Sequence, residues 1–398
     1  MARSVRVNCL ALAAASWFCC PWPAEAAPEP AQATPPSSSG KQTAPEKPKA
    51  PKPPKPPRKP WAPDTRKWDI EFHVAAGFGS TSDGGSGELP KPGATFTTGG
   101  GADSRHVPSW FFGDGARLFN DVLAALGRAE AIVPLDPAIT GPAVEQTVEN
   151  AIGVRVTRAL TPILAIEVEG NVARSTYTVR QETKNALDAT SDSFFSAFGG
   201  LVASGQGVAF TSPALSSSFN WQDGQGADIV TTVSLVIHPK KDGRVRPYVV
   251  VGGGVAASVG QAQATLTGRY SFRVPDGGTV DESDTVTIHF GGGVGLAGVA
   301  GAGLNFRVTR GSGIRVDARG QFLENHVPTS IDAHPSAVAS NPAQAVWSFT
   351  TPALQFVTNP STGLASSLDT SGLSGVTTLH ASGFYSRASI TVGYFWRF

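Results

Sequence analysis

The last eleven residues of the chain, Ala388 to Phe398, constrain the fold more than any other stretch. Large apolar side chains occupy every second position, at Ile390, Val392, Tyr394, Trp396 and Phe398, and the positions between them are mostly small or polar. A period of two predicts a β-strand with one wholly apolar face. The crowding of aromatic residues at one end is typical of the girdle of a membrane barrel. An ordinary edge strand is the alternative, but an exposed aromatic edge would invite aggregation.

The N-terminus has the pattern of an export signal. Arg3 and Arg6 form a basic start, residues 7–15 form a short apolar core, and Ala24 and Ala26 frame a small-residue cleavage pattern. The apolar run is too short to cross a bilayer as a helix. We therefore expect a signal peptide over 1–26. All three cysteines lie inside it, so the mature chain is expected to lack disulfides and thiolate metal sites.

Residues 27–66 differ in composition from everything that follows. Thirteen prolines fall between Pro28 and Pro63 and alternate with basic residues in the second half of the segment. Such a segment cannot bury a core, and its prolines keep it extended as polyproline II. We interpret it as a periplasmic linker, which is either a plain spacer or a basic arm that contacts the cell wall or another acidic periplasmic partner.

Composition excludes several classes of protein. Only 16% of the residues are charged, and the mean hydropathy of −0.06 is too low for a helical membrane protein. No stretch approaches the ~18 consecutive apolar residues of a transmembrane helix. A barrel escapes this test because its lipid-facing and lumen-facing residues alternate. The net charge of +1 gives no basis for binding nucleic acid.

Alternating segments recur from Trp68 onward, and eight of them predict strands, at about 68–78, 149–157, 162–177, 227–238, 246–260, 285–308, 313–327 and 382–398. Short turns rich in Gly, Pro, Lys and Arg join three of the pairs. The other connections are long, at about 80–147, 179–225, 261–284 and 328–381. Short periplasmic turns and long extracellular loops are typical of a transmembrane barrel. We therefore predict an all-β fold over 67–398, an eight-stranded antiparallel up-and-down barrel with both ends in the periplasm.

Three motifs resemble the OmpA-type small outer-membrane barrel family. They are Arg246-Pro247-Tyr248 before a glycine-rich strand, Gly303-Leu304-Asn305-Phe306, and Gly313-Ile314-Arg315-Val316-Asp317-Ala318-Arg319. The resemblance covers about 67–398 without the loops and implies the family's eight-stranded fold. It also implies the outer membrane of a Gram-negative bacterium, with membrane lipid, lipopolysaccharide and the barrel assembly machinery as partners. The terminal stripe, which ends at Phe398, resembles the assembly signal of outer-membrane proteins. Two departures are expected: the OmpA peptidoglycan-binding domain is missing, and the loops are longer than the family core needs.

Extending the alternation places charges of both signs in the lumen: Asp69, Glu71, Arg155, Glu167, Glu169, Arg307, Arg315, Asp317, Arg319, Arg387 and Arg397, with His73 and Asn305 beside them. Charges at lipid depth are costly, so the lumen must hold and pair them. Because a barrel of eight strands is only wide enough for side chains to fill, a salt-bridged plug is one interpretation. A narrow polar pore, or a gate that opens when the pairs rearrange, is the other. The strand at 246–260 stays unassigned, because Val249, Val250 and Val251 are consecutive.

Arg174 is an exception to this charge pattern, because its phase faces outward. It lies either near the outer interface, where anionic lipopolysaccharide would meet it, or in a loop beyond the membrane.

The long loops hold one further pattern. Residues 116–126 place apolar side chains at helical spacing, followed by Gly127 as a cap. The neighbouring Trp110, Phe111 and Phe112 are strongly apolar. A helix that caps the barrel mouth and a surface that binds a partner are the two interpretations.

Catalytic chemistry finds little support in the sequence. His380 and Ser382 have the spacing of a deacylase pair in some small barrels, but the Glu that such enzymes use further along the chain is missing. The histidines form no tight ligand cluster, so we expect no cofactor, no metal site and no enzymatic activity. Two functions remain: a structural or surface-interaction barrel of the envelope, or a narrow porin-like channel for small solutes.

Overall fold

A computed structural model describes residues 67–79, 87–92, 95–97, 103–203, 215–240, 243–273, 279–324, 327–339, 355–356, 365–368, 372–379 and 384–398. All of them belong to the compact unit Pro60–Phe398. The predicted signal peptide, with Ala24 and Ala26, and the Pro/Lys-rich segment 27–66 lie outside the described residues.

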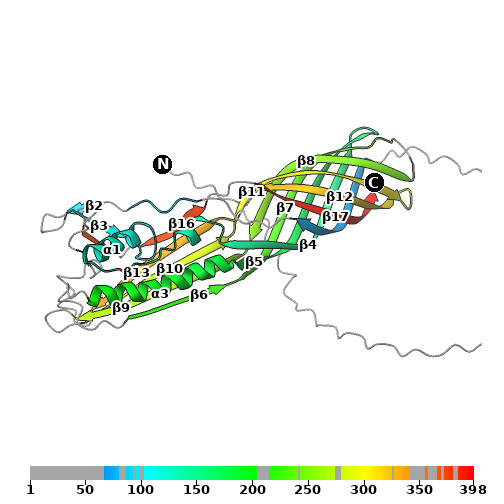
Figure 1. Ribbon diagram of the computed structural model, residues 1–398. Coiled ribbons are helices and arrows are strands. Elements are labelled where there is room, and N and C mark those ends of the chain that lie inside the picture. Colours follow the sequence, from blue (N-terminus) through cyan, green and yellow to red (C-terminus); the bar gives the residue numbers. More distant parts are fainter. Residues whose placement is uncertain are drawn as a thin grey trace, which may run out of the picture. The chain divides into compact units, whose positions relative to one another are not determined.

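Eight antiparallel strands close into a barrel (Figure 1). Around the ring they are β1 (Trp68–Gly79), β17 (Phe384–Arg397), β12 (Ser312–Glu324), β11 (Val294–Arg307), β8 (Val245–Val259), β7 (Gly224–Ile237), β5 (Leu164–Val179) and β4 (Val144–Ala159). The terminal strand closes the ring, because β17 pairs with β1 from Asp69↔Arg397 to Gly79↔Arg387. The predicted fold class is therefore confirmed. One predicted strand, 285–308, is wrong in extent, because it is interrupted at 292–293 and only its second part, β11, belongs to the barrel.

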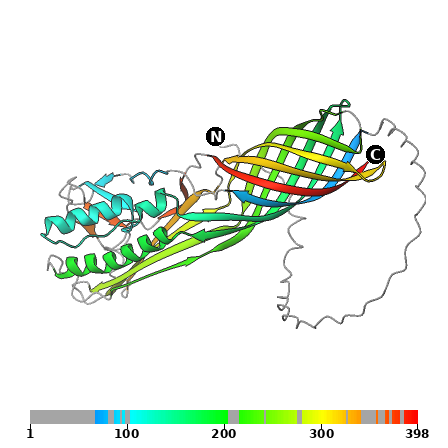
Figure 2. The same ribbon diagram turned by 45° about the vertical axis from the view of Figure 1, so that its right-hand side comes forward.

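The long connections fold into two further sheets (Figure 2). Five strands pair in the order β16 (Leu373–Leu379), β13 (Thr329–Ala339), β10 (Thr279–Gly291), β9 (Gln261–Arg273) and β6 (Leu215–Gln222). Four short strands pair in the order β14 (Gln355–Phe356), β15 (Ala365–Leu368), β3 (Asp103–Val107) and β2 (Thr95–Thr97). We call the five-stranded sheet the outer sheet, since it lies beyond the barrel end that carries the long connections.

Glycines mark two of the points where barrel strands continue into the outer sheet. Only Gly260 separates β8 from β9, and its φ of 118° lies in the region that favours glycine. Gly291, with φ 123°, ends β10 just before β11 begins. A Cβ at Gly260 would also lie 2.6 Å from the backbone oxygen of Gln225 on β7. Larger residues would therefore strain both the conformation and the packing at this junction.

Three helices accompany the outer sheet: α1 (Gly113–Ala125), α2 (Asp136–Thr140) and α3 (Gln181–Ala203). The predicted helix is confirmed as α1, and Gly127 follows it with φ 70°. On α3, Leu187, Phe194 and Phe198 are spaced seven and four residues apart, so they share one buried face. Among the described residues, no helix combines the length and apolar character needed to cross a bilayer.

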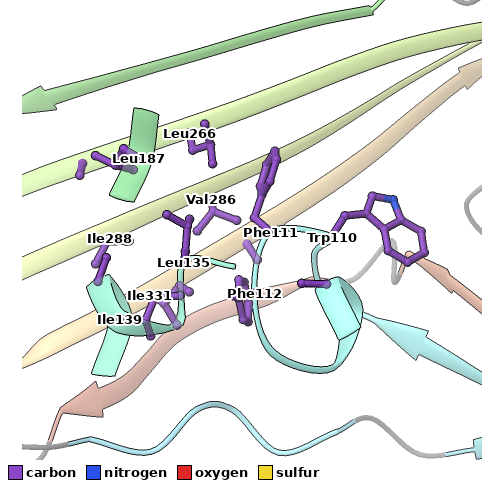
Figure 3. Packing of buried hydrophobic residues seen from close by; sticks show 14 of the residues in the cluster. Trp110, Phe111, Phe112, Leu135, Ile139, Leu187, Leu266, Val286, Ile288 and Ile331 are labelled. Atoms are coloured by element: carbon purple, nitrogen blue, oxygen red, sulfur yellow. The ribbon is translucent and has the colours of Figure 1, made fainter. Parts of the chain in front are cut away.

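A hydrophobic core lies between the helices and one face of the outer sheet (Figure 3). Trp110, Phe111 and Phe112, which precede α1, belong to this core together with Leu266 of β9 and Val286 of β10. Each of the three aromatic side chains is at most 2% exposed. The two predictions for this segment, a cap on the barrel mouth and an exposed binding surface, are therefore wrong: its aromatic residues build the core of a second folded region.

Candidate functional site: the ion network of the barrel lumen

The period of two along four barrel strands brings ionisable side chains to the inside. Glu71 and His73 come from β1, Arg155 from β4, and Glu167 and Glu169 from β5. Across the lumen, β12 adds three more, Arg315, Asp317 and Arg319. All eight side chains are buried, with at most 5% exposure, so each ion must be compensated by its neighbours.

Arg155 lies at the centre of the network and is completely buried. Its Nη1 donates to Glu71 Oε1 at 2.6 Å and to Asp317 Oδ2 at 3.2 Å. Its Nη2 donates to Glu169 Oε1 at 3.0 Å, and its Nε lies 3.3 Å from Glu167 Oε1. One guanidinium therefore connects carboxylates from three different strands.

The two arginines of β12 complete the network from the opposite wall. Arg319 donates to Glu169 Oε2 at 2.5 Å, to Glu167 Oε1 at 2.8 Å and to Asp317 Oδ1 at 2.9 Å. Arg315 Nη1 donates to Glu167 Oε2 at 2.7 Å and to Glu71 Oε2 at 3.0 Å. Charge-assisted hydrogen bonds of this kind are the strong ones, and they tie β1, β4, β5 and β12 together across the lumen.

Three uncharged side chains, two of which the sequence did not reveal, support the network. Tyr248 of β8 donates its hydroxyl hydrogen to Asp317 Oδ2 at 2.5 Å, and the Arg315 guanidinium stacks over its ring at 4.6 Å. Asn171 Oδ1 lies 2.6 Å from His73 Nε2. The third, Asn305, accepts from Arg315 Nε at 2.9 Å. Tyr248 was hidden by the consecutive valines of β8, whose outward residues are Val249 and Val251.

The remaining predicted lumen residues lie toward the two ends of the barrel. Arg397 forms a bidentate pair with Asp69, each contact 2.6 Å, at the end of the short turns. At the other end, Arg387 donates to Asp228 Oδ2 at 3.0 Å and to Gln321 Oε1 at 2.8 Å. Asp228 was not predicted. Arg307 is also buried, at 4% exposure. The structure therefore separates the predicted residues into a central network and two peripheral groups.

Little space remains between the central network and Arg387. A cavity of about 20 Å³ lies there, lined by residues that include Glu149, Glu169 and Gln321, and a volume of this size holds about one water molecule. A larger hollow, about 770 Å³, opens instead on the outward apolar wall beside Phe72 and Tyr394. Of these two hollows, the larger therefore lies outside the lumen.

The outward face of the barrel carries the apolar residues. Phe72 and Val74 of β1 are 57% and 58% exposed, and the terminal stripe is also exposed: Ile390, Val392, Tyr394, Trp396 and Phe398. Trp396 contacts Phe72 edge-on at 6.1 Å, and Arg158 stacks over Trp68 at 5.2 Å. An aliphatic wall with aromatic residues near one end is the surface that a transmembrane barrel presents to lipid.

Arg174 is exposed on the outward face of β5 and donates to Gln225 Oε1 at 2.7 Å. Its predicted contact with lipopolysaccharide stays a prediction. No group of three or more metal-binding side chains with suitable geometry occurs within the described part of the chain.

Three outer-membrane proteins are among the solved structures to which the chain is similar. OprG from Pseudomonas aeruginosa is 10% identical, with 84% of this chain and 97% of OprG covered and a TM-score of 0.31. AlkL is 12% identical, with 86% and 94% covered and a TM-score of 0.30. The Escherichia coli protease OmpT is 9% identical, with 85% and 99% covered and a TM-score of 0.30.

Structural similarity at such low identities and TM-scores says nothing about the activity of this chain. No protein-family model matches the chain, and no curated protein matches it. The OmpA-type resemblance therefore stays a prediction, while the fold shown is a closed antiparallel β-barrel with eight strands.

Proposed function

We propose that the protein is an outer-membrane barrel of a Gram-negative bacterium that anchors a folded, surface-exposed interaction domain. One observation carries the proposal: a barrel filled with paired charges continues, strand by strand, into a second sheet with its own hydrophobic core. A closing loop needs only a few residues. The long connections of this chain instead bury aromatic residues and build helices, which indicates that the outer part has a task of its own.

The membrane location is supported by the outward face of the barrel. Its exposed side chains are mainly Val, Ile, Leu and aromatic residues, which would be a large apolar patch on a soluble protein. In a bilayer the same surface is covered by acyl chains. A location in the outer membrane is supported because the barrel is closed, and a closed barrel leaves no unpaired strand edge in lipid.

An anchoring role is supported by the filled lumen. The central network blocks the barrel with side chains from four strands, and the cavity above it has room for about one water molecule. A channel for small solutes, the second function considered, would require these buried pairs to separate. That opening leaves several charges unpaired in a confined space and is therefore costly. The proposal includes no catalytic turnover.

Conductance measurements distinguish the two functions. Purified protein in planar bilayers is expected to give no large, steady single-channel currents. Such currents from the wild-type protein would favour the channel instead.

Cysteine labelling tests the surface exposure of the outer part, because all three native cysteines lie in the predicted signal peptide. Asp188→Cys on α3 and Lys240→Cys in the turn after β7 are both at exposed positions. A membrane-impermeant maleimide added to intact cells should label Asp188→Cys at once and Lys240→Cys only after permeabilisation. The reverse pattern would contradict the proposed topology.

A further inference from the structure

The outer sheet has two faces of different character. The α-helices and the hydrophobic core lie on one face, where Leu266 and Ile288 are completely buried. The opposite face carries mainly polar side chains, among them Ser218, Thr267 and Thr285. Because alternate residues point to opposite faces, this second face follows directly from the strand register.

The strand register arranges these polar side chains in four rows across the sheet. The rows are Ser216–Arg269–Ser283–Ser336, Ser218–Thr267–Thr285–His334, Asn220–Thr265–Thr287–Asp332, and Gln222–Gln263–His289–Ser330–Thr377. We call this surface the polar face. Neighbouring rows lie two residues apart along each strand, and neighbouring strands are about 4.8 Å apart. The polar face is therefore a regular grid of hydroxyl and amide groups.

Threonines occupy the middle of the grid. Thr265 Oγ1 lies 3.3 Å from Thr287 Oγ1, and Thr267 Oγ1 lies 3.2 Å from Thr285 Oγ1. Between the central strand β10 and its neighbour β13, His289 Nε2 lies 3.0 Å from Asp332 Oδ2. The hydrophobic core on the other side fixes the backbone beneath these groups, so their spacing is set before any ligand arrives.

The polar face carries unusually little charge for the solvent side of a sheet. Exposed sheets commonly carry Lys and Glu, which oppose aggregation. The four rows contain two charged side chains, Arg269 and Asp332, of opposite sign, and the adjoining row Ser271–Asp281–Val338 adds a third, Asp281. Such a face has neither the charge to select an ionic partner nor the apolar area to hold a lipid or an apolar protein surface. Its groups both donate and accept hydrogen bonds.

We infer that the polar face binds a neutral polysaccharide. A chain of sugar rings offers a repeating series of hydroxyls, which also donate and accept, without net charge. Many weak contacts along a repeating ligand add up when they engage together. The inference deepens the proposed function, on which it rests, by giving the surface domain a class of ligand.

Binding of the full chain in detergent micelles to dextran, laminarin, mannan and agarose tests this inference, with the anionic polygalacturonate as a comparison. We expect retention on at least one neutral polymer. Thr267→Val with Thr285→Val, which removes two central hydroxyls but keeps the β-branched shape, should weaken that binding at least tenfold. The matched control is Thr147→Val with Thr176→Val, a register pair on β4 and β5 of the barrel, which should bind like the wild type.

Several results would overturn the inference. They are failure of the folded protein to bind any neutral polymer, preference for polygalacturonate, equal loss of binding in both double variants, and a polar face covered by a second copy of the chain. Heat-modifiable gel migration verifies that each variant is folded. Conductance and cysteine labelling are measured separately, so the glycan inference can fail while the anchoring role stands.

Discussion

Replacing Arg319 by Met tests whether the lumen network holds the barrel together. Arg319 is 2% exposed and makes three short contacts, with Glu167, Glu169 and Asp317. Charges ~4 Å apart attract by ~4 kcal/mol at an effective dielectric constant of ~20. The desolvation of each buried ion offsets much of this, and loss of one partner from a buried pair typically costs about 3–5 kcal/mol. We expect Arg319→Met to lower the free energy of unfolding by that amount.

The matched control is Arg117→Met on α1. Arg117 also contacts two carboxylates, Asp114 at 2.5 Å and Asp121 at 3.6 Å, but its side chain is 48% exposed. Exposed ion pairs contribute about 0–1 kcal/mol because water and salt screen them. A double variant, Glu169→Gln with Arg319→Met, should cost less than the sum of its single changes, with a coupling of at least ~1 kcal/mol.

Urea unfolding in phospholipid vesicles, followed by tryptophan fluorescence and heat-modifiable migration, provides these free energies. Single-channel recordings on the same samples give the conductance, which should stay near the wild-type value. If Arg319→Met cost no more than Arg117→Met, or if it opened a large conductance without loss of stability, the network would not be the structural plug described above.

Four further predictions concern separate parts of the chain. Burial raises the pKa of Asp284 to about 7, against the opposing hydrogen bonds from the Trp110 amide and the Ser109 hydroxyl. The unfolded carboxyl ionises near pH 3.8, so the stability of the outer part should fall as the pH rises from about 4 to about 7. Asp284→Asn should flatten this slope in urea unfolding between pH 4 and 8, and an unchanged slope would contradict the assignment. Deletion of Phe398 should impair barrel assembly but not export, and normal heat-modifiable folding in cells would count against an assembly role. Mass spectrometry of membrane-extracted protein should find cleavage near Ala26, which a mature chain containing Cys19 would exclude. Protease added to intact cells should spare residues 27–66, and cleavage there before permeabilisation would place them outside the cell.

The barrel strands follow from the sequence because lipid and lumen impose opposite demands on alternate residues. The predicted strand at 162–177 corresponds to β5, Leu164–Val179, and the predicted strand at 227–238 to β7, Gly224–Ile237. Where both faces carry small residues, this contrast fades. The glycines around Gly291 hide the junction between β10 and β11 in this way. Because alternation continues on both sides of them, the prediction joins the two strands into one at 285–308.

The outer sheet was not predicted, and its residues explain why. The core face of β9 contains Ala262, Ala264 and Gly268, which give a weak apolar period. On β10 the core face includes Glu282 and Asp284, which read as solvent-facing positions in a sequence. Their burial depends on partners from distant connections, such as Ser109 and Trp110, which hydrogen-bond to Asp284.

For the lumen, alternation indicates which faces carry charge but not which charges meet. Arg155 and Asp317 are 162 residues apart in the sequence, yet lie 3.2 Å apart across the barrel. Such pairs follow from ring closure and strand tilt, which no local pattern encodes. Tyr248 and Asp228 were not predicted as lumen residues for a simpler reason: neither the strand phase nor the charge pattern singled them out.

The core of the outer part has a consequence for the order in which the chain folds. Trp110, Leu187, Leu266 and Ile331 belong to four different connections, yet they lie in one core. No single hairpin carries all of the core residues, so we expect this core to form after the barrel strands have brought the four connections together. Contacts between segments so distant in sequence form slowly and leave apolar surface exposed in the meantime. The barrel therefore acts as the template on which the outer part folds, and a defect in the seam between β1 and β17 should first become visible as a misfolded surface.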